Sequence, residues 1–209
     1  MACFITLEGG EGAGKSTQAR RLATWLRGRG LQVQTTREPG GTPGAELLRR
    51  ALLSKEVEGW DPVTEALIVT AARRDHVERL IRPSLAAGVW VVCDRFVDST
   101  VAYQGHAGGL DLGRIAELQS FATDGLQPDL TIVLDLPPER GLARAGRRDG
   151  ALVGRFEERP LDFHRRLRAG FLEIAAHAPQ RCVVIDADRG EDAVAADLIG
   201  IVTQRLAVP

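Results

Sequence analysis

The sequence predicts a single α/β domain over residues 1–209, with a five-stranded parallel sheet and helices on both of its faces. Five short apolar runs alternate with longer segments of helical periodicity, which is typical of a parallel sheet that is covered on both sides. The 209 residues are 44% hydrophobic, which is enough for one sizeable core. No internal repeat and no linker rich in Pro, Gly or Ser divides the chain.

The predicted elements follow one another in regular order. Apolar runs predict strands at 3–8, 31–36, 89–93, 130–136 and 182–185. Apolar residues at helical spacing predict helices at 17–29, 45–53, 62–87, 111–124, 161–176 and 192–206, with one more helix before the arginine-rich segment 140–159. Gly28 and Gly30 end the first helix, and 37–42 is a glycine-containing loop.

Composition excludes several classes of protein. The net charge of −1 gives no reason to expect a nucleic-acid partner, and the apolar runs are too short to span a bilayer. Cys3, Cys93 and Cys182 lack metal-ligand spacing, and each lies at or in an apolar run. We therefore expect buried thiols in a cytoplasmic protein that binds neither nucleic acid nor membrane.

Residues 9–16 (Gly-Gly-Glu-Gly-Ala-Gly-Lys-Ser) match the phosphate-binding P-loop pattern in full, between a predicted strand and a predicted helix. The loop N–H groups and the helix N-terminus favour phosphate oxygens. Of 27 basic residues only Lys15 and Lys55 are lysine, so a lysine here indicates a need for a compact, mobile charge. The predicted ATP-binding residues are Gly10, Glu11, Gly12, Ala13, Gly14, Lys15, Ser16 and Thr17.

A P-loop also needs a carboxylate on the metal side, at the end of a neighbouring strand. Asp94 and Asp135 both follow apolar runs. Asp94 is preferred because Arg95, directly after it, would add a phosphate clamp, whereas Asp135 is interpreted as a strand-end cap. We predict that Ser16 and Asp94 hold Mg²⁺, directly or through a water molecule.

The sequence also narrows the chemical class of the group that accepts the transferred phosphoryl group. It contains no evident Cys/His pair or Ser/His/Asp arrangement, and its four histidines follow no ligand spacing. A hydroxyl acceptor calls for a base that removes its proton. A phosphate monoester, whose second pKa is about 6, needs none at pH 7. Two polyanions must then be brought together, which requires arginines on both sides.

Further motifs accompany the P-loop, in a fixed order. They are 6–9 (Thr-Leu-Glu-Gly), 37–42 (Arg-Glu-Pro-Gly-Gly-Thr), 64–66 (Thr-Glu-Ala), 71–73 (Ala-Ala-Arg), 94–105 (Asp-Arg-Phe, then Ser-Thr-Val-Ala-Tyr-Gln-Gly) and 155–157 (Arg-Phe-Glu). Over essentially its whole length the chain resembles the thymidylate kinase family, and 94–105 is the most specific segment. The resemblance implies a homodimeric bacterial-type enzyme that moves the γ-phosphoryl group of Mg·ATP onto dTMP, a step of dTTP supply.

The resemblance also implies which residues bind the acceptor. Arg49, Arg95 and the backbone near Glu38 and Pro39 are expected to hold its phosphate. The physical chemistry agrees, because arginine can grip a phosphate in a bidentate manner. Without the resemblance, Arg49 would be interpreted as an exposed side chain on a helix that carries other arginines.

The base and sugar of the acceptor have their own set of implied contacts. Arg73, Thr100 and Gln104 are expected to read the thymine edge, and a glutamine can both donate and accept there. Tyr103 is expected against the deoxyribose, where it would disfavour a 2′-hydroxyl, and Glu11 near the 3′-hydroxyl. Taken alone, Arg73 would be interpreted as exposed and Tyr103 as a core residue.

The resemblance further implies a short mobile lid at about 140–159 that supplies a catalytic cation. Some family members carry that arginine in the P-loop, at the position of Gly12. Arg155 is preferred because it lies in the Arg-Phe-Glu motif, with Arg147 and Arg148 in reserve. The predicted catalytic residues are therefore Lys15, Asp94, Arg95 and Arg155.

Two positions depart from the family pattern. Val69 stands where an aromatic residue commonly stacks on thymine, and Gly154 where an aspartate usually precedes the Arg-Phe-Glu motif. Three alternatives stay open: another or a relaxed monophosphate kinase that accepts dUMP, a deoxynucleoside kinase, and a nucleotide-binding switch without transfer activity. The helices at 62–87 and 111–124 are candidates for the dimer interface.

Overall fold

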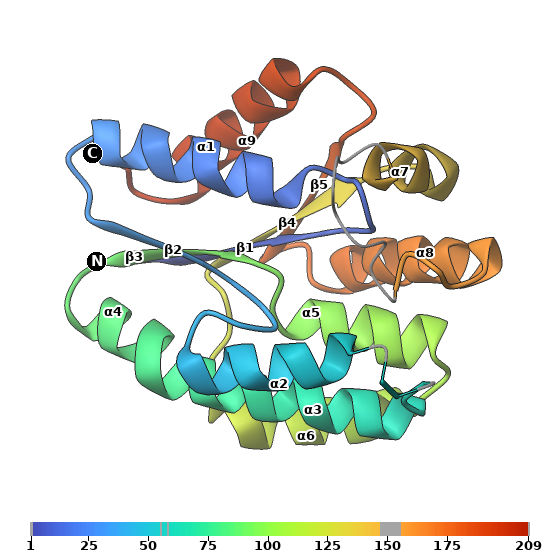
Figure 1. The fold of residues 1–209 in the computed structure, drawn as a ribbon. Helices are drawn as coiled ribbons and strands as arrows, with labels where there is room; N and C mark the ends of the chain where they lie inside the picture. Colours follow the sequence, from blue (N-terminus) through green and yellow to red (C-terminus); the bar gives the residue numbers. More distant parts are fainter. Residues whose placement is uncertain (1, 55, 58, 147–155, 209) are drawn as a thin grey trace.

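The computed structural model describes residues 2–54, 56–57, 59–146 and 156–208 (Figure 1). Its five strands form one sheet in the order β2-β3-β1-β4-β5, and every neighbouring pair is parallel. The strands are β1 (Phe4–Glu8), β2 (Val33–Arg37), β3 (Trp90–Asp94), β4 (Leu130–Asp135) and β5 (Cys182–Asp186). The predicted five-stranded parallel sheet is confirmed.

Helices cover both faces of the sheet (Figure 1). On one face lie α1 (Lys15–Gly28) and α9 (Glu191–Arg205). The other face carries α2 (Pro43–Leu53), α3 (Pro62–His76), η1 (Val77–Ile81), α4 (Arg82–Ala86), α5 (Val97–Thr100), η2 (Val101–Ala107), α6 (Leu112–Thr123) and α8 (Leu161–His177). The short helix α7 (Pro138–Ala145) follows β4.

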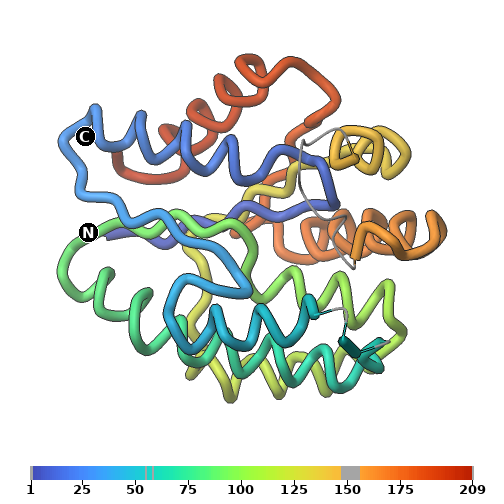
Figure 2. Tube along the Cα trace, in the orientation of Figure 1, coloured from blue at the N-terminus to red at the C-terminus, as the bar shows by residue number. Residues whose placement is uncertain are grey.

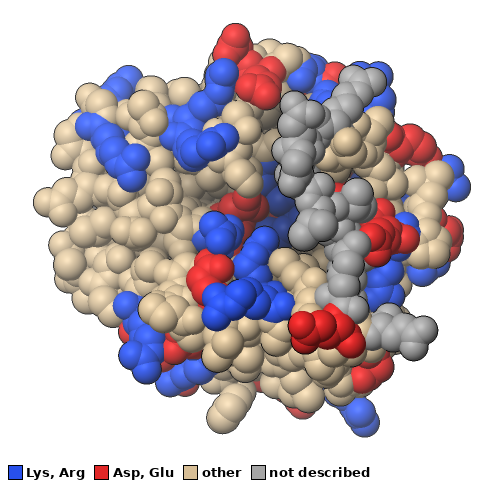
Figure 3. All heavy atoms as spheres, viewed as in Figure 1, with Lys and Arg blue, Asp and Glu red and all other residues tan. Residues whose placement is uncertain are grey.

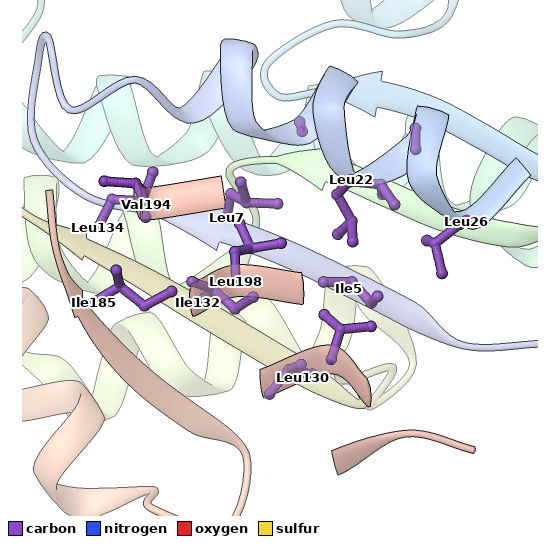
Figure 4. Packing of buried hydrophobic residues seen from close by; sticks show 14 of the residues in the cluster. Ile5, Leu7, Leu22, Leu26, Leu130, Ile132, Leu134, Ile185, Val194 and Leu198 are labelled. Carbon is purple, nitrogen blue, oxygen red and sulfur yellow. The ribbon is translucent and has the colours of Figure 1, made fainter. Parts of the chain in front are cut away.

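The core is divided by the sheet, because successive side chains of a strand point to opposite faces. Ile5 and Leu7 of β1 pack with Leu22 and Leu26 of α1 in the cluster that Figure 4 shows. Phe4, which precedes Ile5 and therefore points the other way, belongs to the cluster on the other face. Both faces of the sheet are therefore buried against apolar side chains. This explains why the strand sequences are unbroken apolar runs rather than alternating apolar and polar residues.

Residues 97–107 form the helical elements α5 and η2, which the sequence pattern does not predict. Their Ser, Thr, Val and Gly residues have low helix propensity. The segment is held by tertiary contacts instead: Glu8 of β1 accepts hydrogen bonds from the N–H of Phe96 (2.7 Å) and the hydroxyl of Ser99 (2.6 Å). A local pattern carries no signal of such a distant anchor.

The long helix expected at 62–87 is present as a continuous run of α3, η1 and α4 (Figure 2). Its middle part, Val77–Ile81, has the wider π-helical hydrogen-bond pattern. Pro83 lies two residues after it, and proline has no N–H and crowds the carbonyl of the preceding turn. The helix accommodates that proline by widening rather than by ending.

The arginine-rich segment 140–159 is described only in part. Its first residues belong to α7. Arg147, Arg148, Gly154 and Arg155 lie outside the described residues.

The three cysteines are free thiols; Cys93 and Cys182 are buried as expected, and Cys3 is only half-buried. Among the helices in the described part of the chain, none has the length and apolar character to cross a bilayer.

Candidate active site

A cavity of about 780 Å³ lies at the carboxyl ends of the central strands. Basic and acidic side chains gather around the hollow at the centre of the face in Figure 3. The cavity is lined by most of the predicted residues: Glu11, Gly12, Ala13, Gly14, Lys15, Ser16, Thr17, Glu38, Pro39, Arg49, Val69, Arg73, Asp94, Arg95, Thr100, Tyr103 and Gln104. Gly10 is the one predicted binding residue in the described part of the chain that does not line it.

The P-loop is pressed against the start of α7. A Cβ atom built on Gly12 would lie 2.0 Å from the carbonyl oxygen of Gly141, and one on Gly141 would lie 2.3 Å from that of Glu11. Gly12 also has φ of +67°, which disfavours side chains. The position where some relatives place a catalytic arginine therefore has no room for one in this chain.

Lys15 is the first residue of α1 and is buried. Its Nζ donates to the carbonyl oxygens of Gly9 (3.1 Å) and Gly10 (2.7 Å). Burial, and then the positive charge of Arg95, lower the pKa of Lys15 to about 8. An ammonium group whose hydrogen bonds go to neutral carbonyl oxygens thus lies inside the loop whose N–H groups suit phosphate.

The two candidate metal-side carboxylates lie in different surroundings. The Asp94 carboxylate accepts a short hydrogen bond from the hydroxyl of Ser16 and lines the cavity. Asp135 forms a bidentate pair with Arg168 of α8, at 2.7 and 2.8 Å, and does not line the cavity. The geometry favours Asp94 for a role at the phosphates.

Arg95 follows β3 in an unusual backbone conformation, with φ of +76°. For a residue other than glycine this costs about 1 kcal/mol or more, so the surroundings must hold it in place. Its N–H donates to Leu7 (3.0 Å), and Glu8 secures the next residues through Phe96 and Ser99. The end of β1 therefore fixes the direction in which the Arg95 side chain leaves the sheet.

The guanidinium group of Arg95 lies between the P-loop and Tyr103. It donates to the Gly9 carbonyl (3.0 Å) and the Glu11 carboxylate (3.1 Å), and it lies over the Tyr103 ring at 4.8 Å. The Tyr103 hydroxyl donates to the same Glu11 oxygen at 2.5 Å. Burial opposes the charge on Glu11, but Arg95 and Lys15 outweigh it and lower the pKa of Glu11 to about 2.

Two more arginines line the same side of the cavity. Arg49 of α2 donates to the carbonyl oxygen of Pro39 (2.8 Å), next to the cis bond between Glu38 and Pro39. Burial, and then the like charge of Arg37, lower the pKa of Arg49. Two cations that line one cavity favour the binding of a multiply charged anion there. Arg37 was not a predicted site residue, although it opens a quoted motif.

Arg73 is buried rather than exposed, and most of its donors are used within the protein. It donates to Glu38 (2.6 Å), to Thr100 (2.9 Å) and to the carbonyl oxygen of Phe96 (2.8 Å), and it forms a short hydrogen bond to Gln119. Four of its five N–H donors are thus occupied by partners in the described part of the chain.

Val69, Thr100 and Gln104, which were predicted to contact the base, line the same cavity as Arg73. Gln104 donates to the carboxylate of Glu65 (3.2 Å), which in turn pairs with Arg159 (2.5 Å). Glu65 and Arg159 were not predicted as site residues, nor were Arg144 and Arg189, which line the cavity near the P-loop. The quoted Thr-Glu-Ala motif is the only sequence signal that could have indicated Glu65.

Comparison with known proteins adds independent findings. The thymidylate kinase family model matches residues 7–198. The chain is 57% identical over 203 residues to a thymidylate kinase of Caulobacter vibrioides, covering 97% of each chain. It is 52% identical over 210 residues to one of Rhodopseudomonas palustris, covering 99% of this chain and 90% of the relative.

A solved structure agrees with these sequence matches. The crystal structure of thymidylate kinase from Ehrlichia chaffeensis has a TM-score of 0.77 and 35% identity to this chain. The similarity covers 96% of this chain and 98% of that one.

The lowered pKa of Lys15 predicts how ATP binding depends on pH. A lysine with a pKa of about 8 is charged at pH 7 and mostly neutral at pH 9, so its attraction for phosphate is lost as pH rises. The dissociation constant for ATP should rise by about tenfold from pH 7 to 9, measured by calorimetry at saturating Mg²⁺. In Lys15→Arg the side chain stays charged up to pH 9. The dissociation constant of this variant for ATP should therefore not rise between pH 7 and 9. A wild-type constant that does not change over this range would contradict the prediction.

Proposed function

The chain belongs to the thymidylate kinase family, and we propose that it transfers the γ-phosphoryl group of ATP to the phosphate of dTMP, forming dTDP for dTTP supply. The main support is that one cavity joins the P-loop to the arginine-lined pocket that contains Gln104. A donor and an acceptor nucleotide can thus meet with their phosphates between two sets of cations. We also propose that residues 1–209 form a single nucleoside monophosphate kinase domain, with a lid within about 140–159.

On the donor side, the P-loop residues bind the ATP phosphates. The carbonyl oxygens of Gly9 and Gly10 now accept from Lys15, and the outer phosphates of ATP would replace them as its partners. That exchange substitutes full negative charges for neutral acceptors, so it strengthens the hydrogen bonds of Lys15.

The residues at the loop fit a magnesium ion. Ser16 and Asp94 provide a hydroxyl and a carboxylate oxygen in direct contact, and oxygen ligands are those that Mg²⁺ prefers. In the described residues no group of three His, Cys, Asp or Glu side chains is placed to hold a metal ion. An ion at Ser16 and Asp94 would take its remaining ligands from water and phosphate, and it would neutralise charge on the transferred group.

On the acceptor side, no general base is required, because the second pKa of a phosphate monoester is about 6. Arg49 and Arg95 supply positive charge, with Glu38 and Pro39 shaping the wall between them. Arg95 is already oriented by Gly9, so it need not reorganise when the phosphate arrives. Tyr103 and Glu11, joined by a hydrogen bond, would lie against the deoxyribose and near its 3′-hydroxyl.

The transfer also needs a cation at the γ-phosphoryl group. The crowding of Gly12 against Gly141 supports a source outside the P-loop. We propose Arg155, which lies outside the described residues, as that cation.

We propose further that the protein is a cytoplasmic homodimer whose partners are small nucleotides rather than nucleic acid or membrane. The free thiols agree with a reducing compartment. Four large apolar side chains are exposed on two helices that pack together: Val63 and Leu67 of α3 (53% each), and Leu112 (42%) and Phe121 (84%) of α6. Several large apolar side chains exposed on neighbouring helices support a protein interface there.

The substrate assignment is tested with a panel of nucleoside monophosphates in a coupled assay of ADP release. dTMP should give the highest kcat/KM, and dUMP a value about tenfold or more lower, because it lacks the methyl group that Val69 would contact. A higher kcat/KM for another monophosphate would make the chain a different kinase. Tight binding of Mg·ATP with transfer to no acceptor would instead support the nucleotide-binding switch.

The choice between the two carboxylates is tested by Asp94→Asn beside Asp135→Asn. Loss of the Asp94 charge should lower kcat by about 100-fold or more, because it acts on charge that develops in the transition state. Asp135→Asn loses a partly exposed pair with Arg168 and should keep kcat within about threefold, with about 1 kcal/mol lower stability. An inactive Asp135→Asn enzyme beside an active Asp94→Asn enzyme would reverse the assignment.

The dimer is tested by sedimentation velocity. Phe121→Arg puts a charge into the proposed interface, so this variant should sediment as a monomer where the wild type is a dimer. Val184→Arg, at an exposed apolar residue of β5, is the matched control and should stay dimeric. A monomeric wild type, or a dimeric Phe121→Arg variant, would contradict the proposal.

A further inference from the structure

Glu65 lies in the first turn of α3, directly behind the proposed base site. It is 3% exposed and does not line the cavity, whereas its neighbour Gln104 does. Resting on the proposed function, we propose that Glu65 is a specificity-determining positioning residue. It holds the amide of Gln104 in one orientation. That orientation favours binding of pyrimidines that have an N3–H and an O4 over binding of cytosine.

The orientation of the amide follows from the chemistry of its partner. A carboxylate is an acceptor only, so the group of Gln104 that faces Glu65 must be the nitrogen, which lies 3.2 Å from Oε2. Arg159 pairs with the other carboxylate oxygen at 2.5 Å, so a cation lies beside the oxygen that Gln104 does not use. In a flipped amide the oxygen of Gln104 would face the negative charge of Glu65. Glu65 therefore disfavours that orientation.

One N–H of the amide is taken by Glu65. Within the described residues the amide oxygen and the second N–H have no other partner, so both are available to a ligand. Thymine and uracil present a donor at N3 beside an acceptor at O4, which this pair complements. Cytosine presents an acceptor at N3 beside an amino donor, which is the reverse order. A flipped Gln104 would suit cytosine, so the selectivity depends on what prevents the flip.

The carboxylate is itself held from a second direction. Arg159 follows the undescribed segment 147–155, and its guanidinium group lies over the Phe163 ring of α8 at 5.4 Å. Glu65 thus connects α3, η2 and the start of α8. Because Arg159 and Gln104 use different oxygens, removal of Arg159 leaves the bond to Gln104 in place.

The test is a double-mutant cycle of Glu65→Gln and Gln104→Met, with kcat/KM measured for dTMP, dUMP and dCMP. A glutamine at 65 can present either oxygen or nitrogen, so Gln104 is free to flip. The ratio of dTMP to dCMP should fall by about tenfold, roughly the effect of one hydrogen bond. The ratio of dTMP to dUMP should stay within about twofold, because these bases share N3–H and O4.

In the Gln104→Met background, Glu65→Gln should cause no further loss of selectivity, because the residue through which it acts is gone. Gln104→Met alone should lower the dTMP to dCMP ratio, and this remains measurable if Glu65→Gln does not fold. Arg159→Gln should keep most of the ratio, and Glu78→Gln, an exposed ion-paired glutamate of η1, should change nothing.

Three outcomes would overturn the inference while leaving the proposed function intact. They are an unchanged dTMP to dCMP ratio in Glu65→Gln, an equal fall of that ratio in both backgrounds, and an unchanged ratio in Gln104→Met. A wild type with no preference for dTMP over dCMP would contradict the proposed function itself.

Discussion

Mutual repulsion among buried cations is the constraint around which this molecule is organised. Lys15, Arg49 and Arg95 line one cavity, and burial and like charges lower the pKa of the first two. Acceptors of the chain itself hold them apart: loop carbonyls for Lys15, Pro39 for Arg49, and Glu11 for Arg95. The site is therefore arranged for phosphate before phosphate arrives, and the cost of assembling its charges is met by the fold.

The sheet order explains how these groups come together. β1 lies at the centre, and its end continues into the P-loop, while β3 beside it ends in the turn that carries Arg95. Neighbouring parallel strands end at the same edge, where ligands of open α/β sheets bind. Glu8, the last residue of β1, completes the link because its carboxylate secures the turn after β3. Strand pairing and site geometry thus depend on the same few residues.

The sequence predicted what is encoded locally. The strands and the P-loop could be recognised because apolar runs and a glycine pattern suffice for them. The ion pairs of Arg73 and Glu65 could not be predicted in that way. Their partners, Glu38 and Arg159, are 35 and 94 positions away in the sequence. The family resemblance assigned Arg73 to recognition of the base. The structure adds that its hydrogen bonds also connect α3 to Glu38, Phe96 and α6. Residues 97–107 remained unrecognised as helical for the same reason.

The contact between Gly12 and Gly141 bears on how such enzymes diverge. Each glycine faces a backbone carbonyl that would meet a new methyl group at 2.0 or 2.3 Å, so neither can acquire a side chain while the other stays where it is. An arginine gained in the loop would first have to displace α7, and with it the attachment of the segment that follows. Moving the cation to the loop side of this contact would therefore require a backbone shift in addition to the substitution itself.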